Sequence, residues 1–227
     1  MLRWWPFGPY VLVGLVHLAS LSVGADPLSS ATKVLLMPAL LAGLLVALPT
    51  RRTAVALWGS LGILFSWVGD ILLSSPGETG FVTGLGAFML AHVAYLVLFL
   101  RPLRTRRIPP LTLLLVLSPY LGVLLVPVAL YGAVIGSSTA ASFGTSRVVA
   151  AGALFFLVSD TLLAFKMFWP GFTFWQEDLA VMLTYIVGQG LIAAGSVGLV
   201  RRVAWRHERS GRVGSPVPHG VGDESPR

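Results

Sequence analysis

Residues 54–74 read AVALWGSLGILFSWVGDILLS, an apolar run that contains one charged residue, Asp70. A second apolar run contains the similar stretch FFLVSDTLL at residues 155–163, with Asp160 at the matching position. About 20 apolar residues in a helix are enough to cross a bilayer. A carboxylate at the centre of such a helix costs at least about 2.5 to 3.5 kcal/mol on insertion scales. The two aspartates are therefore the first candidates for functional residues.

The composition of the chain indicates an integral membrane protein. Hydrophobic residues make up 56% of its 227 residues and charged residues 11%, with a mean hydropathy of +0.83, whereas roughly 25% of a soluble domain is charged. Cysteine is absent, which excludes disulfides, thiolate metal sites and cysteine nucleophiles. The net charge of +7 comes from arginines at the ends of the apolar runs, so it indicates membrane orientation and no nucleic-acid partner.

Apolar runs bounded by Arg, Pro, Gly or Ser predict the membrane-spanning helices. The predicted spans are residues 7–24, 31–49, 54–74, 81–100, 110–125, 127–143, 148–168 and 178–200. The fifth and sixth runs have no polar loop between them, only Pro119 and Pro127, so hydropathy alone also permits one long kinked helix and seven spans.

The distribution of arginine favours eight spans over seven. With eight spans and a cytoplasmic N-terminus, the Arg-rich segments all fall on the cytoplasmic side, and the opposite side receives Lys33 and Lys166. Seven spans would export Arg147 and the basic C-terminus. We therefore predict an all-α integral membrane protein, a bundle of eight transmembrane helices with both termini cytoplasmic.

The chain is predicted to form one transmembrane domain, residues 1–205, followed by a disordered tail, residues 206–227, that is polar and rich in Gly, Pro and Ser. An alternative for the first run is a cleaved signal peptide, because the sequence Val-Gly-Ala at residues 23–25 resembles a cleavage site. The charge balance of eight spans favours a membrane span. The predicted location is the cell membrane, and the sequence is also compatible with a homo-oligomer.

Polar residues within these spans are predicted to share a depth. At a rise of 1.5 Å per residue, Asp70 lies about 6 Å and Asp160 about 12 Å below the outer boundary of the bilayer. Four further residues fall in the outer half or at the midplane: Lys33, His92, Tyr185 and Gln189. Helical spacing adds Tyr95 beside His92 and Ser66 beside Asp70. The layer predicts one cavity in the outer half of the membrane.

Each polar residue also has a purely structural interpretation. Asp70 could pair with Lys33, and Tyr185 and Gln189 could make hydrogen bonds between packed helices. His17, without a polar residue at helical spacing, is interpreted as structural. Two aspartates and a histidine could hold a divalent metal, but the sequence has no close ligand pair such as HExxH. No metal and no other cofactor are therefore predicted.

An ordered set of motifs in the chain resembles the YhhN-like membrane proteins, which include the mammalian lysoplasmalogenases. The set runs from about Thr32 to Ala194 and comprises a lysine near the start of the second span, FSWVGDILL, GLGAFMLAHVAYL, LYGAVIG, GALFFLVSDTLLAF and MLTYIVGQGL. The resemblance implies eight spans and hydrolysis of the vinyl ether bond of lysoplasmalogens, which yields a fatty aldehyde and a glycerophospho-alcohol. The recurring polar residues of the family fall on Lys33, Asp70, His92, Asp160, Tyr185 and Gln189.

A vinyl ether is hydrolysed after protonation of its β-carbon, so the predicted enzyme needs a proton donor, a nearby negative charge and a water molecule. A carboxyl group in an apolar site keeps its proton near neutral pH, and we assign this role to Asp160. Asp70 would remain ionised and His92 would relay protons, although the two aspartates could exchange roles. The predicted substrate-binding residues for the lysophospholipid are Lys33, Tyr185, Gln189, Tyr95 and Ser66.

A small-molecule or proton-coupled transporter is the alternative function, because buried Asp and His residues also relay ions in carriers. FSWVGDILL and FFLVSDTLL share five of nine positions, which is compatible with a duplicated transporter scaffold. Carriers need polar residues through both halves of the membrane. The predicted cytoplasmic half consists largely of Leu, Val, Ala and Gly, which favours the hydrolase.

Overall fold

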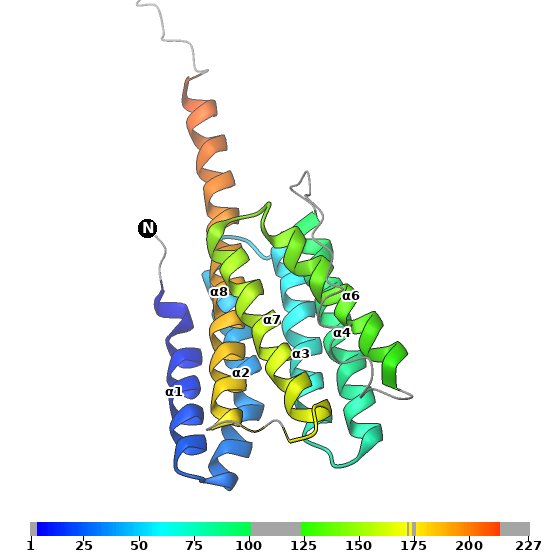
Figure 1. The fold of residues 1–227 in the computed structure, drawn as a ribbon. Helices are drawn as coiled ribbons and strands as arrows, with labels where there is room; N and C mark the ends of the chain where they lie inside the picture. The colour runs from blue at the N-terminus through cyan, green and yellow to red at the C-terminus, as the bar shows by residue number, and fades with distance from the viewer. Residues whose placement is uncertain (1–3, 101–123, 172, 174–175, 214–227) are drawn as a thin grey trace, which may run out of the picture.

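The computed structural model describes residues 4–100, 124–171, 173 and 176–213 (Figure 1). Their regular structure is helical throughout: η1 (Trp5–Phe7), α1 (Gly8–Ser22), α2 (Asp26–Ala47), η2 (Val55–Gly59), α3 (Ser60–Leu73), α4 (Glu78–Leu100), α6 (Leu125–Ser142), α7 (Arg147–Phe168) and α8 (Glu177–Val213). Within the described residues, 6 helices are long and apolar enough to cross a membrane: α2, η2 joined to α3, α4, α6, α7 and α8. The chain is therefore an all-α, multi-pass membrane protein.

Two of the eight predicted spans are not among these six helices. The first, at residues 7–24, corresponds to α1, which has 15 residues and is shorter than a typical span. The fifth, at residues 110–125, lies almost entirely outside the described residues. The number of eight spans and the orientation of the termini therefore stay predictions.

Helix α8 is longer than the sequence predicts. It has 37 residues and ends at Val213, so at 1.5 Å per residue it is about 56 Å long, against a hydrocarbon core of about 30 Å. Residues 206–213, which we expected to begin an irregular tail, continue the helix. Extending an existing helix by one residue costs little free energy compared with starting a new one. The Arg residues and Glu208 of this segment also favour helix. Residues 214–227 lie outside the described residues.

Local sequence signals set several helix ends. Helix α7 begins after Ser146, whose Oγ accepts a hydrogen bond of 3.2 Å from the backbone N–H of Val149. Helix α2 has Pro27 in its first turn, where a missing N–H costs nothing. The turn from α3 to α4 contains Gly77 with φ of +93°, a conformation that other residues rarely adopt.

Helices α7 and α8 are in direct backbone contact. A Cβ atom at Gly152 would lie 2.7 Å from the backbone nitrogen of Ile192, and one at Gly188 would lie 2.8 Å from that of Phe156. Glycine is needed at both positions, since a side chain would push the helices apart. This contact fixes the position of α7 along α8 and the rotation of α7 about its own axis. It therefore also fixes the position of Asp160, about two turns further along α7.

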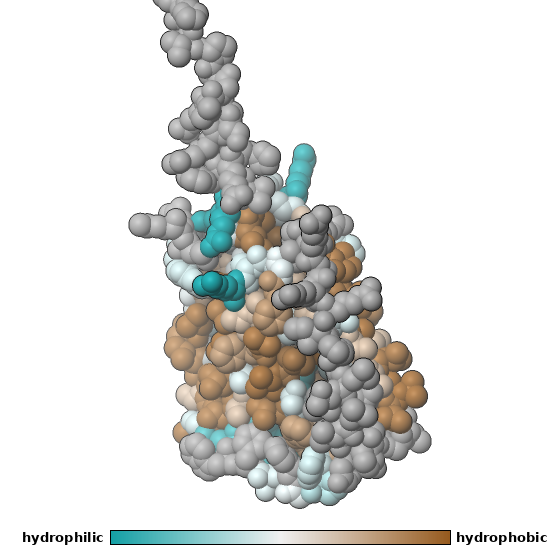
Figure 2. All heavy atoms as spheres, turned by 45° about the horizontal axis from the view of Figure 1, so that its top comes forward, coloured by the Kyte–Doolittle hydropathy of each residue, from teal (hydrophilic) through white to brown (hydrophobic). Residues whose placement is uncertain are grey.

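The helices alternate in direction from α1 to α4, and α7 and α8 are again antiparallel (Figure 1). The α1–α2, α3–α4 and α7–α8 connections lie at one end of the bundle, and α8 protrudes from the opposite end. Apolar side chains cover much of the flank seen in Figure 2, with hydrophilic residues gathered towards the protruding end. An apolar flank between polar ends is the surface expected of a protein surrounded by lipid.

Candidate functional site

A cavity of about 550 Å³ lies between α1, α2, α3, α4, α7 and α8, at the end of the bundle where α1 joins α2 and α3 joins α4. Its wall contains both predicted catalytic carboxylates, Asp70 from α3 and Asp160 from α7. It also contains Lys33 from α2 and Tyr185 from α8. The fold therefore brings four of the predicted site residues to one cavity.

A second, apolar pocket of about 70 Å³ lies between α4, α6 and α7. Its wall is built from side chains such as Leu85, Ile135, Leu157 and Ala164. Asp160 belongs to the walls of both this pocket and the larger cavity. The carboxylate of Asp160 thus lies at the boundary between a polar compartment and an apolar one.

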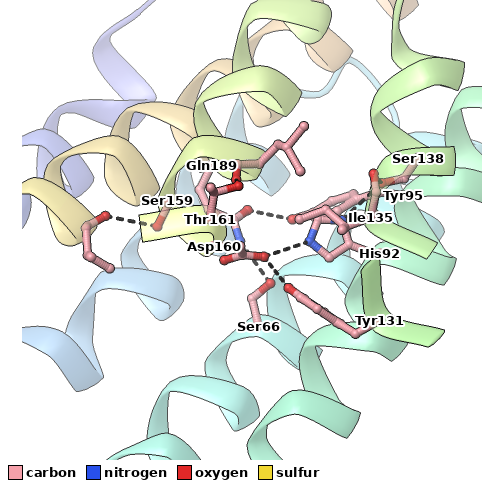
Figure 3. A network of polar contacts seen from close by, with 12 residues as sticks. Ser66, His92, Tyr95, Tyr131, Ile135, Ser138, Ser159, Asp160, Thr161 and Gln189 are labelled. Carbon is pink, nitrogen blue, oxygen red and sulfur yellow. Dashed lines mark hydrogen bonds and ion pairs between the residues drawn. The ribbon is translucent and has the colours of Figure 1, made fainter. Parts of the chain in front are cut away.

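Asp160 is held by two side chains from neighbouring helices. Its Oδ2 accepts a hydrogen bond from the hydroxyl group of Tyr131 on α6. The same oxygen lies 3.7 Å from Nε2 of His92 on α4. Figure 3 shows both partners directed at the Asp160 carboxylate. The side chain of His92 is 3% exposed and that of Asp160 14%, so a proton held here has little contact with bulk water.

The hydrogen bonds of His92 define which ring nitrogen carries its proton. Its Nδ1 lies 3.1 Å from Oγ of Ser138, and that hydroxyl donates its hydrogen to the carbonyl oxygen of Ile135 at 2.9 Å. Because the Ser138 hydrogen is already used, Nδ1 donates to Ser138. In the neutral ring, Nε2 is then an acceptor that faces Asp160.

Asp70 has a different set of partners. It is 5% exposed, and its Oδ2 accepts a hydrogen bond of 2.9 Å from the Tyr185 hydroxyl. The ammonium of Lys33 donates to Oγ of Ser74 at 3.2 Å, and Ser74 donates to the backbone carbonyl of Asp70 at 2.8 Å. Within the described part of the chain no carboxylate lies within 4.0 Å of Lys33. Lys33 and Asp70 are therefore linked through Ser74 and do not form a direct ion pair.

Three of the predicted substrate-binding residues form a separate buried network. Tyr95 donates to Oε1 of Gln189 at 2.6 Å, and Nε2 of Gln189 donates to Oγ of Ser66 at 2.8 Å. All three are at most 1% exposed. None of them belongs to the wall of the 550 Å³ cavity or of the apolar pocket. They connect α3, α4 and α8, and their contact with substrate stays a prediction.

Three residues at the candidate site were not among the site residues predicted from the sequence: Tyr131, Ser138 and His17. Tyr131 and Ser138 contact Asp160 and His92, and their spacing of seven residues places them on one face of α6. This spacing was the feature of the sequence that could have indicated a polar face on α6. His17, which we interpreted as structural, lies in the wall of the larger cavity. Its hydrogen-bond partner Thr32 lies on another helix, so spacing within α1 could not indicate it.

The arrangement of His, Cys, Asp and Glu side chains among the described residues is relevant to metal binding. No group of three or more His, Cys, Asp or Glu side chains in this part of the chain is arranged to hold a metal ion. His92 and Asp160 approach each other as a pair, and Asp70 is separately bonded to Tyr185. Asp160 and Asp70 therefore form two separate carboxylate sites in the wall of one cavity.

Comparison with known proteins agrees with the motifs. No solved structure matches the chain with significance. Human lysoplasmalogenase TMEM86B is 33% identical over 209 residues, a match that covers 86% of this chain and 87% of the human protein. The profile of the YhhN family matches residues 28–196, which include nearly all of α2, the helices from α3 to α7 and the first 20 residues of α8. Because the family profile covers most of the chain, including Asp70 and Asp160, and the human relative is 33% identical over 86% of it, the chain belongs to the YhhN family.

Proposed function

We propose that this protein is a membrane-embedded hydrolase that cleaves the vinyl ether bond of lysoplasmalogens. The observation that carries the proposal is the position of Asp160, at the boundary between a cavity with charged walls and an apolar pocket. A lysoplasmalogen has its vinyl ether at the junction of a polar glycerophosphate and a hydrocarbon chain. Such a lipid can place each part in a compartment of matching polarity while the reacting bond lies beside Asp160. The similarity to human lysoplasmalogenase TMEM86B supports this chemistry.

The reaction consumes one water molecule. A proton is added to the β-carbon of the vinyl ether, which leaves an oxocarbenium ion on the carbon attached to oxygen. Water adds to this carbon and loses a proton, which gives a hemiacetal. The hemiacetal collapses to a fatty aldehyde, and the glycerol oxygen leaves with a proton as the alcohol. The protein must therefore donate one proton, stabilise a cation and recover the proton from water.

Asp160 is the proton donor in this proposal. The Nε2 lone pair of His92 and the Asp160 carboxylate face each other at 3.7 Å, so the pair can hold one proton between them. Tyr131 donates to the same carboxylate oxygen and fixes its orientation. After transfer to the β-carbon, His92 accepts the proton released by the attacking water and returns it to Asp160.

Asp70 supplies the negative charge. The Tyr185 hydroxyl holds its carboxylate, and Lys33 lies one side chain away through Ser74. An ionised Asp70 stabilises the oxocarbenium ion, because opposite charges attract strongly in a poorly hydrated site. Lys33 is available for the phosphate of the lipid, since no carboxylate among the described residues neutralises it. Outside the cavity wall, hydrogen bonds connect α3, α4 and α8 through Ser66, Tyr95 and Gln189.

The proposed location is the cell membrane, with the cavity in the outer half of the bilayer. The connection that holds Arg51 and Arg52 and the first residue of α7, Arg147, lie at the end of the bundle opposite the cavity. Because Arg-rich connections remain in the cytoplasm, this arrangement supports a cavity that faces the outer leaflet. It also supports cytoplasmic termini.

The experiment is aldehyde release from a lysoplasmalogen by detergent-purified protein. Wild-type protein releases aldehyde, and Asp160→Asn and Asp70→Asn lower the rate by at least about 100-fold, the usual range for loss of a general acid or a preorganised charge. Glu78→Gln is the matched control, because Glu78 is an exposed carboxylate in the first turn of α4, outside both compartments. Each variant must elute as a monodisperse species. Absence of aldehyde from every lipid, with Asp-dependent uptake of a solute into proteoliposomes, would favour the transporter.

A further inference from the structure

His17 is a buried histidine in the wall of the cavity that the proposed reaction does not use. It lies in the middle of α1, and its side chain is 1% exposed. Its Nδ1 lies 2.9 Å from Oγ1 of Thr32 on α2. Its Nε2 is buried and has no hydrogen-bond partner among the described residues. A buried polar atom without a partner is unfavourable, so a ligand that supplies the missing partner gains affinity.

The contacts of Thr32 establish what kind of partner His17 needs. Oγ1 of Thr32 lies 2.7 Å from the carbonyl oxygen of Leu28 and 3.1 Å from that of Ser29. Two oxygens 2.7 Å apart share a hydrogen, so the Thr32 hydroxyl donates to Leu28. The same oxygen can then only accept from His17, which places the ring proton on Nδ1. Nε2 of the neutral ring carries a lone pair and requires a donor.

A series of contacts connects the functional groups in the wall of the cavity. Ser159, next to Asp160, donates to the carbonyl of Val181 at 3.0 Å, one turn before Tyr185 on α8. Tyr185 bonds Asp70, and Ser74 links Asp70 to Lys33. His17 follows, bonded to Thr32, the residue before Lys33. This series of contacts leads from Asp160 through Asp70 and Lys33 to His17.

A lysophospholipid presents its groups in the same order: vinyl ether, glycerol, phosphate and headgroup amine. With the phosphate at Lys33, the adjacent headgroup amine can contact His17, because both residues belong to the wall of the cavity and His17 is bonded to Thr32, the residue before Lys33. An ethanolamine ammonium has N–H hydrogens to donate, whereas the quaternary ammonium of choline has none. The charge of the donor strengthens such a hydrogen bond. Asp178, another carboxylate in the cavity wall, is already paired with Lys166 at 2.7 Å.

We propose that Nε2 of His17 accepts a hydrogen bond from the headgroup amine and makes the protein selective for ethanolamine over choline lysolipids. This inference rests on the proposed function and assigns the headgroup end of the same cavity. It follows from the juxtaposition of an unpartnered acceptor with the unpaired ammonium of Lys33.

The test compares lysoplasmenylethanolamine, its N-methyl and N,N-dimethyl derivatives, and lysoplasmenylcholine, all with one alkenyl chain. In the wild-type protein kcat/KM falls about tenfold or more at the last methylation, which removes the final N–H. His17→Met removes the acceptor, so kcat/KM becomes similar for the four lipids. His17→Gln restores much of the preference, because its amide can donate to Thr32 and accept from the amine. Equal kcat/KM for the four lipids in wild type, or an unchanged series in His17→Met, overturns the inference.

Two further measurements separate a folding defect and a failed reaction from a failed inference. Ser20→Ala is the matched control, because it removes a buried hydroxyl that bonds the His17 carbonyl on the same helix but does not belong to the cavity wall. We expect this variant to show the same fall in kcat/KM across the methylated lipids as the wild-type protein. Thermal stabilisation of purified protein by saturated lysophosphatidylethanolamine and lysophosphatidylcholine gives a readout without turnover. If no lipid yields aldehyde, the proposed reaction is wrong. The headgroup site is still supported if the ethanolamine lipid stabilises the wild-type protein more than the choline lipid does and His17→Met abolishes that difference. Equal stabilisation by both lipids overturns it.

Discussion

Nε2 of His92 on α4 lies 3.7 Å from Oδ2 of Asp160 on α7, with its lone pair facing the carboxyl group. In the proposed reaction, this relationship allows His92 to receive a proton from water and return it to Asp160. His92→Phe keeps the edge contact with Phe156, whose ring centroid lies 4.5 Å away, and removes the proton acceptor. We expect aldehyde release to fall by about 10²-fold or more, measured as kcat by trapping the aldehyde. Retained kcat would remove His92 from the proton path.

The hydroxyl of Tyr131 orients the Asp160 carboxylate, so Tyr131→Phe should lower kcat while leaving substrate affinity nearly unchanged. We expect a loss of about tenfold, equivalent to one hydrogen bond to a charged group. Tyr10→Phe is the matched control, because Tyr10 donates to the backbone carbonyl of Ile186 at 2.7 Å, outside both compartments. It should cost about 1 kcal/mol of stability and little activity. An equal loss of kcat in both variants would contradict the assigned role of Tyr131.

Gln189 is predicted to act on stability more than on chemistry. Gln189→Met leaves the hydroxyls of Tyr95 and Ser66 buried without their partner, at about 1–3 kcal/mol for each orphaned group. The expected result is a lower melting temperature in detergent and a smaller loss of kcat/KM than in Asp70→Asn. A normal melting temperature with lost activity would instead place Gln189 in contact with substrate. Ser137→Ala, on the exposed face of α6, should change neither quantity.

The contact of α7 with α8 predicts the effect of adding a single methyl group. In Gly188→Ala the new Cβ meets the backbone nitrogen of Phe156 at 2.8 Å, so the helices must separate. We expect destabilisation of about 1–3 kcal/mol, the usual cost of overpacking. Gly132→Ala on α6 meets no atom within 4 Å and should leave the melting temperature unchanged or higher. Equal melting temperatures for the two variants would show that the helices are not held at this spacing.

The apolar pocket predicts that KM depends on the length of the alkenyl chain of the lipid. Ala164→Trp places a large ring in the pocket beside Asp160 and should raise KM for long alkenyl chains more than for short ones. Ala133→Trp adds the same ring at an exposed position of α6 outside the pocket and should leave the chain-length profile unchanged. The profile is measured with lysoplasmalogens of graded chain length. A uniform rise in KM for all chains would place the hydrocarbon elsewhere.

Hydropathy and helix rise predicted the six helices that are long and apolar enough to cross a membrane, and the proximity of Asp70, Asp160, His92 and Tyr185. Both quantities depend only on position along a single helix. Contacts between helices depend on rotation about the helix axes, which a single sequence does not contain. For this reason Tyr131 was not among the predicted site residues, and the bonds of His17 to Thr32 and of Gln189 to Tyr95 and Ser66 were not predicted. The end of α8 was placed too early, because the composition of its last residues outweighed the tendency of a helix to continue.

The backbone contact between Gly152 and Gly188 has a consequence for how the sequence of this protein can change. A spacing set by side chains drifts whenever a neighbouring residue becomes larger or smaller, but α7 and α8 meet through main-chain atoms at this crossing. Asp160 and Tyr185 therefore keep their separation while the surrounding core is repacked. Substitutions elsewhere in the bundle can alter the shape of the cavity, and with it the lipid that fits, without moving these two groups relative to each other.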